Sequence, residues 1–238
     1  MQVVDPTTNS ASLEEYCNNF FISWKLLFGE QKYQACYDLS KSVIDILKPL
    51  YRNRLYGESP EAVEGYNFAY LFLILAKSLE DLIELVDLTK DGTWTNDNKL
   101  VEVIWDKLWD AKERLDKFKS HCTEGGVLDG IYDQLEKLES DFREIFGSGI
   151  YMSPVLLIKS AECTICGKNI KACSHIPGNL YDGISCKEKV VDFELHGADI
   201  VQSPFDMRCR IWPWNFTKEM TFQARLHSLG SIDDFITH

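Results

Sequence analysis

The chain has 238 residues, of which 45% are hydrophobic and 26% are charged. This apolar content excludes a disordered chain and fits one or two packed domains. The formal net charge of −12 lies almost wholly in residues 1–150, which hold 16 Lys and Arg against 27 Asp and Glu, whereas residues 151–238 hold 9 against 10. The negative field of the first part opposes nonspecific binding to nucleic acid and to anionic lipid.

The N-terminus and the apolar runs predict a chain with no secretion signal and no membrane span. Residues Met1–Asn9 are polar and lack a basic segment followed by an apolar one. The most apolar run, Phe68–Ala76, has nine residues, whereas a membrane span needs about 20. Eight cysteines without such a signal are typical of a reducing compartment, where clustered cysteines bind metal more often than they pair. We therefore expect a cytoplasmic protein.

Five segments between residues 13 and 146 have the apolar spacing of helices. They are expected at 14–28, 31–55, 60–88, 97–120 and 128–146. The connections between them are short, which favours antiparallel neighbours and therefore an antiparallel helical bundle. The stretch 66–75 is apolar almost all round, so we expect the third helix to lie at the centre of that bundle.

Individual residues predict where these helices begin and end. Pro49 should end or kink the second helix near Leu47, because proline removes a hydrogen bond and clashes with the preceding turn. Ser59 followed by Pro60 predicts the start of the third helix, with the serine hydroxyl as its cap. Asn96 is the expected cap of the fourth helix.

The pattern changes after the glycine-rich stretch 147–149, which is the expected domain boundary. Short β-branched and apolar runs then predict strands, and a possible closing helix follows; these segments are 155–158, 190–195, 199–202, 208–214 and 217–229. The prediction is therefore a helical domain, 1–148, followed by a small α+β module, 149–238. The fold class that we expect is mainly α.

A cluster of cysteine and histidine residues lies near the start of this module. Its members, all within 24 residues, are Cys163, Cys166, Cys173, His175 and Cys186. Zinc takes four tetrahedral ligands from thiolates and imidazoles. A Cys-x-x-Cys turn presents two sulfurs to one ion, and a glycine directly after it allows a tight turn. Because further ligands follow soon after the pair, a zinc-binding module is favoured over a thioredoxin-type redox motif.

Five candidate ligands exceed the four places around a zinc ion. The preferred, compact set is Cys163, Cys166, Cys173 and His175. The alternative set replaces Cys173 or His175 with Cys186, which the turn at 181–183 can bring back to the site. Both sets remain open at this point.

The predicted role of the zinc ion is structural. The nearest acids, Glu162 and Asp182, do not form a known catalytic spacing with the cluster. The C-terminal part has about 88 residues and few long apolar runs, and metal binding can supply much of the folding free energy of such a module.

The residues from Cys163 to Ile211 resemble a small zinc-binding segment of uncharacterised bacterial and phage-associated proteins. The shared pattern is C-x-x-C-G-K, then C-x-H-x-x-G-x-x-Y-x-G, followed by strands and a proline-containing turn. The resemblance covers about 50 residues and does not extend to the helices. It implies a bacterial or mobile-element origin, and it carries no activity.

Two further patterns suggest contact with nucleic acid, and both have a simpler interpretation. Arg114 and His121 are spaced as in helical ribonucleases of the HEPN type, but an apolar residue follows the arginine, and a surface arginine with a helix-end histidine is the commoner case. Arginines and tryptophans alternate between 208 and 214, as in single-strand binding platforms. A half-buried strand with arginine stems packed on rings is favoured.

We therefore predict a bacterial, non-enzymatic interaction or adaptor protein with a structural zinc site, from a phage-defence or mobile-element setting. Its partner would be a protein, and no membrane is involved. The alternative is a nucleic-acid-acting protein or an enzyme, for example a HEPN-like ribonuclease, whose zinc module contacts the substrate.

Overall fold

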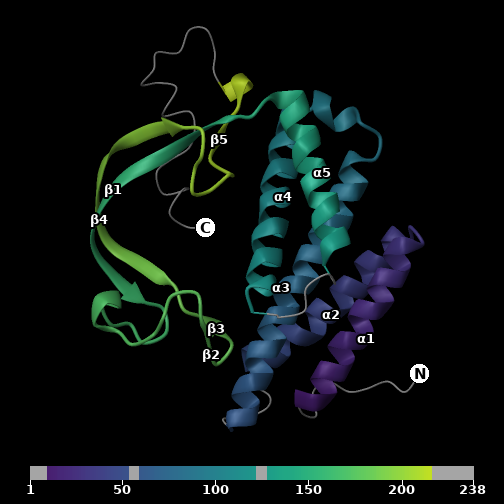
Figure 1. Cartoon of the computed structure of the whole chain (residues 1–238), viewed down its shortest axis with the longest axis vertical. Helices are drawn as coiled ribbons and strands as arrows, with labels where there is room; N and C mark the ends of the chain where they lie inside the picture. Colours follow the sequence, from purple (N-terminus) through teal and green to yellow (C-terminus); the bar gives the residue numbers. More distant parts are fainter. Residues whose placement is uncertain (1–9, 54–58, 122–127, 216–238) are drawn as a thin grey trace.

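The computed structural model of the chain describes residues 10–53, 59–121 and 128–215 (Figure 1). In these ranges five helices precede an antiparallel sheet, so the fold is mainly α with a small β-containing part, as predicted. The helices are α1 (Ser10–Gly29), α2 (Tyr33–Asn53), α3 (Pro60–Thr89), α4 (Asn98–Lys119) and α5 (Asp129–Phe146). The arrangement of these helices as an antiparallel bundle stays a prediction. Cys122 and the expected helix at 217–229 lie outside the described residues.

Helix α3 is the central helix of the helical part, which comprises α1 to α5. It packs against α1, α2 and α4. Its side chains are buried on most sides, with Tyr66, Leu75 and Leu79 at most 1% exposed. This burial agrees with the apolar sequence of the segment, because only a helix surrounded by others can hide apolar residues all round.

The beginnings of α3 and α4 show how far a cap can be read from sequence. The Ser59 hydroxyl accepts a hydrogen bond of 3.2 Å from the Ala62 amide, as predicted. The cap of α4 is Asp97 rather than Asn96, so that prediction was wrong. Asn96 is the last residue of the short 3-10 helix η1 (Thr93–Asn96) and so does not precede α4 directly. The Asp97 carboxylate instead accepts hydrogen bonds of 3.0 and 3.2 Å from backbone amides in the first turn of α4.

The prediction that Pro49 ends or kinks α2 near Leu47 was also wrong in its first part, because the helix continues to Asn53. Leu47 and Leu50, on either side of the proline, are at most 1% exposed, so burial continues past it. Pro49 itself is exposed, as is Asp45, whose carbonyl loses its helical partner. Water can therefore satisfy that carbonyl, which lowers the cost of the proline.

The sheet part consists mainly of two long strands, β1 (Ile150–Cys163) and β4 (Glu188–Val201), which pair antiparallel along nearly their whole length. We call this pair the ribbon. The expected separate strands at 190–195 and 199–202 are one strand, and 155–158 is only the middle of β1. Three irregularities interrupt the register of the ribbon. Such bulges bend and twist a strand pair, which accounts for the curve of the ribbon away from the helices in Figure 1.

The near end of the ribbon is anchored on the helical part. Here the short strand β5 (Arg210–Ile211) pairs with the start of β1. The Trp105 indole of α4 donates a hydrogen bond of 2.7 Å to the carbonyl of Met207. The Arg210 guanidinium lies 4.8 Å from the Trp105 ring and 4.5 Å from the Trp212 ring. It also donates hydrogen bonds of 2.9 Å to the carbonyls of Phe146, the last residue of α5, and of Gly147, which follows the helix.

The far end of the ribbon also returns to the helices. It leads into a loop with a two-stranded hairpin, β2 (Leu180–Tyr181) and β3 (Ile184–Ser185). The Gly183 amide at the hairpin turn donates a hydrogen bond of 2.6 Å to the Asn67 side chain of α3. A Cβ atom at Gly183 would lie 2.9 Å from the Tyr51 ring, so only glycine fits this contact. The ribbon and its loop therefore form an arch that meets the helices at both ends (Figure 1).

The change from helix to strand falls at the predicted boundary, since α5 ends at Phe146 and β1 begins at Ile150. Tyr151 and Trp212 of the sheet part nevertheless belong to the same buried cluster as the helical core. The division into two domains, 1–148 and 149–238, stays a prediction. Among the described residues, no helix combines the length and the apolar character that crossing a membrane requires.

Candidate metal centre

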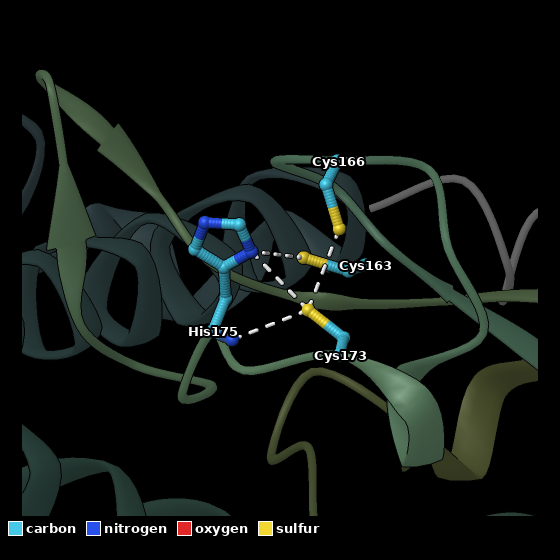
Figure 2. A group of neighbouring side chains, drawn as sticks. All are labelled: Cys163, Cys166, Cys173 and His175. Atoms are coloured by element: carbon cyan, nitrogen blue, oxygen red, sulfur yellow. Dashed lines mark hydrogen bonds between the residues drawn. The ribbon is translucent and has the colours of Figure 1, made fainter.

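Four of the predicted ligands converge at the far end of the ribbon (Figure 2). Cys163 is the last residue of β1, and Cys166 lies in the turn that follows. Cys173 comes directly after the short 3-10 helix η2 (Ile170–Ala172), and His175 lies in the extended segment beyond it. We call these four residues the Cys/His cluster.

The ligand atoms of the cluster all lie within 4.8 Å of one another. The Sγ atoms of Cys166 and Cys173 are 3.4 Å apart. The His175 Nδ1 atom lies 3.2 Å from Cys173 Sγ and 3.7 Å from Cys163 Sγ. The side chains of the turn 163–166 and of the segment 173–175 thus point toward a common centre, as Figure 2 shows.

These distances fit a tetrahedral metal ion with sulfur and nitrogen ligands. With metal–sulfur bonds of about 2.3 Å and metal–nitrogen bonds of about 2.0 Å, the edges of a tetrahedron are about 3.8 Å between sulfurs and about 3.5 Å between sulfur and nitrogen. Three of the observed separations, of 3.2 to 3.7 Å, lie close to these edges, and none of the others exceeds 4.8 Å. The residues present are therefore able to hold one ion with little rearrangement.

Backbone amides turn toward the thiol groups of the cluster. The Ile165 amide donates a hydrogen bond of 3.3 Å to Cys163 Sγ, and the His175 amide donates one of 3.2 Å to Cys173 Sγ. Gly167 has a φ of 67°, which lets its amide donate back to the Cys163 carbonyl at 2.8 Å. The glycine after the Cys-x-x-Cys pair thus closes the turn that brings the two sulfurs to one side, as the sequence predicted.

The His175 ring is oriented by Tyr181, a residue whose supporting role the sequence reading did not identify. The two rings meet edge to face with centroids 4.6 Å apart. The Tyr181 hydroxyl accepts a hydrogen bond of 2.9 Å from the Ile176 amide, which fixes the tyrosine against the segment that carries the histidine. A second residue that holds a ligand ring in place is usual at metal sites.

Cys186 lies beside the Cys/His cluster rather than within it. Its Sγ atom is 3.8 Å from Cys163 Sγ, and the side chain is 1% exposed. The Cys186 amide donates a hydrogen bond of 2.8 Å to the Asn179 carbonyl, and the Cys186 carbonyl accepts one of 2.9 Å from the Gly178 amide. The compact set is therefore the one whose ligand atoms are all mutually close, and Cys186 is a fifth thiol at its buried edge.

The electrostatics of the cluster favour a bound cation. Burial raises the pKa of the Cys163 thiol, but amide donors at Cys166 and Ile165 outweigh it and bring the pKa down to about 6. Burial raises the pKa of Cys173 to about 11, and the negative charge of Cys163 adds to this rise. The sulfurs cannot all ionise together unless a positive charge lies between them.

The remaining cysteines are not part of this site. Cys17 and Cys36 are fully buried in the helical core, as predicted, and burial raises the pKa of Cys36 to about 11. Burial likewise raises the pKa of Cys209, which lies next to β5. The cysteines within the described residues are all free thiols, which agrees with a metal-binding rather than a disulfide-bonded framework.

The residues that suggested nucleic-acid contact are engaged inside the protein. The Arg114 guanidinium forms ion pairs with Asp81 and Asp110, and the His121 ring is held by the Lys117 carbonyl at 3.0 Å. Arg210 is 6% exposed and lies over the rings described above, and Trp212 is 4% exposed. The preferred interpretation of a strand with arginine stems packed on rings is thus confirmed for Arg210.

Comparison with protein-family models, with curated proteins and with solved structures finds no match to this chain. The assignment of the cluster therefore depends on its own geometry. That geometry shows a Cys₃His group that is able to hold a metal ion. The identity of the ion belongs to the proposal that follows.

Proposed function

We propose that this chain is a non-enzymatic interaction protein, an adaptor, whose arch presents a protein-binding surface and whose Cys/His cluster holds a structural zinc ion. The observation that carries the proposal is an exposed apolar face on the ribbon. Leu156 pairs with Leu195 and Ile158 pairs with Phe193, so all four side chains share one face. Ile158 is 49% exposed and Leu195 is 39% exposed.

A two-stranded ribbon is only marginally stable in water by itself, because it has no core of its own. An apolar face left exposed on such a ribbon would therefore be stabilised if another molecule covered it. Contiguous apolar surface on a folded protein usually marks a site of contact with another molecule. The two strands of the ribbon, 150–163 and 188–201, hold five Asp and Glu against two lysines, and this local negative charge opposes nucleic acid and anionic lipid as that molecule. A protein partner whose apolar surface is surrounded by lysine and arginine would match both the apolar face of the ribbon and its negative charge.

Zinc is the ion that fits the donor set best, because three thiolates and one imidazole in a tetrahedron are typical of structural zinc sites. A closed set of four protein ligands leaves no position for substrate, which favours a structural role. When bound, the ion would tie the end of β1 to the loop that reaches α3. The resemblance of residues 163–211 to segments of phage-associated proteins supports a bacterial or mobile-element setting.

The structural role of the metal is tested by metal analysis of the purified chain and of its Cys163→Ser variant. We expect about one zinc per chain, lost in the variant, with a lower melting temperature because the far end of the arch is released. The matched control is Cys36→Ser, a fully buried thiol outside the cluster. Zinc content and stability unchanged by Cys163→Ser would refute the structural site.

The interaction surface is tested with a photo-crosslinking residue at position 158 of the ribbon, expressed in the native host. We expect a discrete protein adduct, which disappears when Leu195 is changed to Ser. The control position is Ile22, an apolar residue of α1 that is 59% exposed. Equal adducts at the two positions would contradict the proposal, and copurifying nucleic acid, seen as a raised 260/280 nm ratio, would favour the nucleic-acid alternative.

A further inference from the structure

A groove of about 630 Å³ lies between the helical part and the far end of the arch. Tyr70 and Ile74 of α3 line one side, and α4 lines the floor with residues 110–120. The loop that carries the metal ligands covers the other side with Gly178 and with residues 185–187. The groove therefore exists only where the loop is folded onto the helices.

The arginines of the groove are already neutralised. Arg114 forms ion pairs with Asp81 and Asp110. Arg208 forms ion pairs with Asp110 at 2.5 Å and with Glu113 at 2.9 Å. These pairs leave the two arginines little attraction for a further ion. The remaining carboxylate of the groove, Asp116, accepts a hydrogen bond of 2.8 Å from the Tyr132 hydroxyl.

The two lysines of the groove have no carboxylate partner among the described residues. The Lys117 ammonium donates a hydrogen bond to the uncharged carbonyl of Gly178. Lys187 is exposed, and within residues 10–53, 59–121 and 128–215 its ammonium has no bonded partner. Burial and the positive charge of Lys187 both lower the pKa of Lys117, so the two ammonium groups repel each other.

We propose that the groove binds a small phosphate monoester, with its phosphoryl group between Lys117 and Lys187. A phosphate monoester carries about −1.5 to −2 charges at neutral pH, which matches two ammonium groups better than a single carboxylate does. Lysine is a common phosphate ligand because its ammonium offers three donors around one charge. Tyr70 and Ile74 supply an apolar wall for the organic group of the ester.

The acidic charge of the chain does not oppose this ligand as it opposes a polymer. Charges are screened over about 8 Å at physiological salt, so a small anion responds mainly to the groups beside it. A nucleic acid would extend beyond the groove across the acidic helices and be repelled. The inference is independent of the proposed function, because it involves neither the apolar face of the ribbon nor the identity of the metal.

The test is calorimetric titration of the full-length chain, as purified, with inorganic phosphate and with phenyl phosphate. We expect both to bind, and phenyl phosphate to bind more tightly because its ring meets the apolar wall. Lys187→Gln should weaken binding about tenfold, the usual effect of losing one charge-assisted contact. Lys171→Gln, an exposed lysine of the same loop outside the groove, is the matched control and should bind as the parent does.

The Lys187 side chain makes no hydrogen bond or ion pair in the described structure, so Lys187→Gln is expected to fold and to keep its metal. Weaker phosphate binding by this variant would therefore not result from unfolding. Lys117→Gln is a second variant, checked by its melting temperature because Lys117 also bonds Gly178. Failure of the folded parent protein to bind either probe at millimolar concentration would overturn the proposal. Equal affinities of the parent and Lys187→Gln would do the same.

Discussion

The helical part and the sheet part of this chain are stabilised in different ways. Helices α1 to α5 surround a continuous apolar core, in which Trp24, Leu79 and Leu108 are fully buried. The middle of the ribbon is exposed on much of its surface, and it is held at its two ends instead. Burial of apolar area thus stabilises the first part, whereas a few specific contacts at its ends hold the second, and we propose that a metal ion in the Cys/His cluster adds to them. Changes at single residues should therefore affect the two parts differently.

Trp105 of α4 should give the largest effect, because its side chain contacts both parts. Replacing it with Ala should lower the free energy of unfolding by about 3–5 kcal/mol, the usual cost of removing a buried tryptophan. It also removes the hydrogen bond to Met207 and one of the rings that contact Arg210. Urea unfolding followed by far-UV circular dichroism measures the loss.

Trp24→Ala is the control for that prediction, since Trp24 is equally buried but lies within α1. We expect a similar loss of free energy in the control, with the metal retained more firmly than in Trp105→Ala. Equal rates of metal release to a chelator in the two variants would show that the near end of the ribbon does not support the far end.

Arg210→Lys should give the next largest effect, about 2 kcal/mol, because hydrogen bonds from a charged donor contribute about 1.5–3 kcal/mol. A lysine keeps the charge but cannot bond two carbonyls at the end of α5 while stacking on two rings. Arg143→Lys, at an arginine of α5 that is 40% exposed and paired with Glu139, should change the free energy of unfolding much less. The comparison fails if both variants unfold at the same urea concentration.

Asp97→Ala should cost about 1 kcal/mol, the typical loss when a helix cap is removed. The effect should be confined to the helical part, with zinc content unchanged. Asn96→Ala is the matched control, and it should be nearly neutral because Asp97 supplies the cap. The melting temperatures of the two variants test which residue is the cap. A larger fall in melting temperature for Asn96→Ala than for Asp97→Ala would reverse the assignment.

Asp106 should give the smallest effect, and one that depends on pH. Its side chain is exposed to solvent, yet the protein atoms around its carboxyl group desolvate it in part, and together with the neighbouring carboxylates, Asp110 first, they raise its pKa to about 6. The unfolded chain has a pKa near 3.9 at this residue, so the folded state binds the proton more tightly. Its contribution to stability is therefore fully present at about pH 4 and is lost as the pH rises to about 6.

Asp106→Asn should remove this loss, so that the melting temperature of the variant falls less between pH 4.5 and pH 7 than that of the parent. Asp133→Asn, an exposed change on α5, is the control and should leave the pH profile unaltered. A parent profile that rises over this range while the variant profile stays flat would contradict the sign.

The sequence predicted best those features that depend on neighbouring residues. The helices, the start of α3 at Ser59 and the convergence of Cys163, Cys166, Cys173 and His175 all follow from local spacing. The cap of α4 was placed one residue early, because η1 extends the preceding turn through Asn96. Pro49 was expected to stop a helix that continues to Asn53, because the burial of the residues around it outweighs the local cost.

Features that depend on distant pairing could not be predicted. The length of the ribbon follows from the pairing of Tyr151 with Val201 and of Cys163 with Glu188, which no local pattern shows. The contact of Gly183 with α3 joins residues 116 positions apart. Tyr181 gave no sign that it would orient His175, since a tyrosine near a turn is common. The groove also depends on this return of the loop to the helices.

The attachment of the arch at both ends has a kinetic consequence. A hairpin with a free tip loses its backbone hydrogen bonds by fraying from that tip, one pair at a time. The ribbon has no free tip, because its turn is replaced by a loop that holds the metal ligands and bonds α3. Its amide protons should therefore exchange with solvent in a single cooperative opening, at a rate that one end contact can set for all fourteen residues of β4.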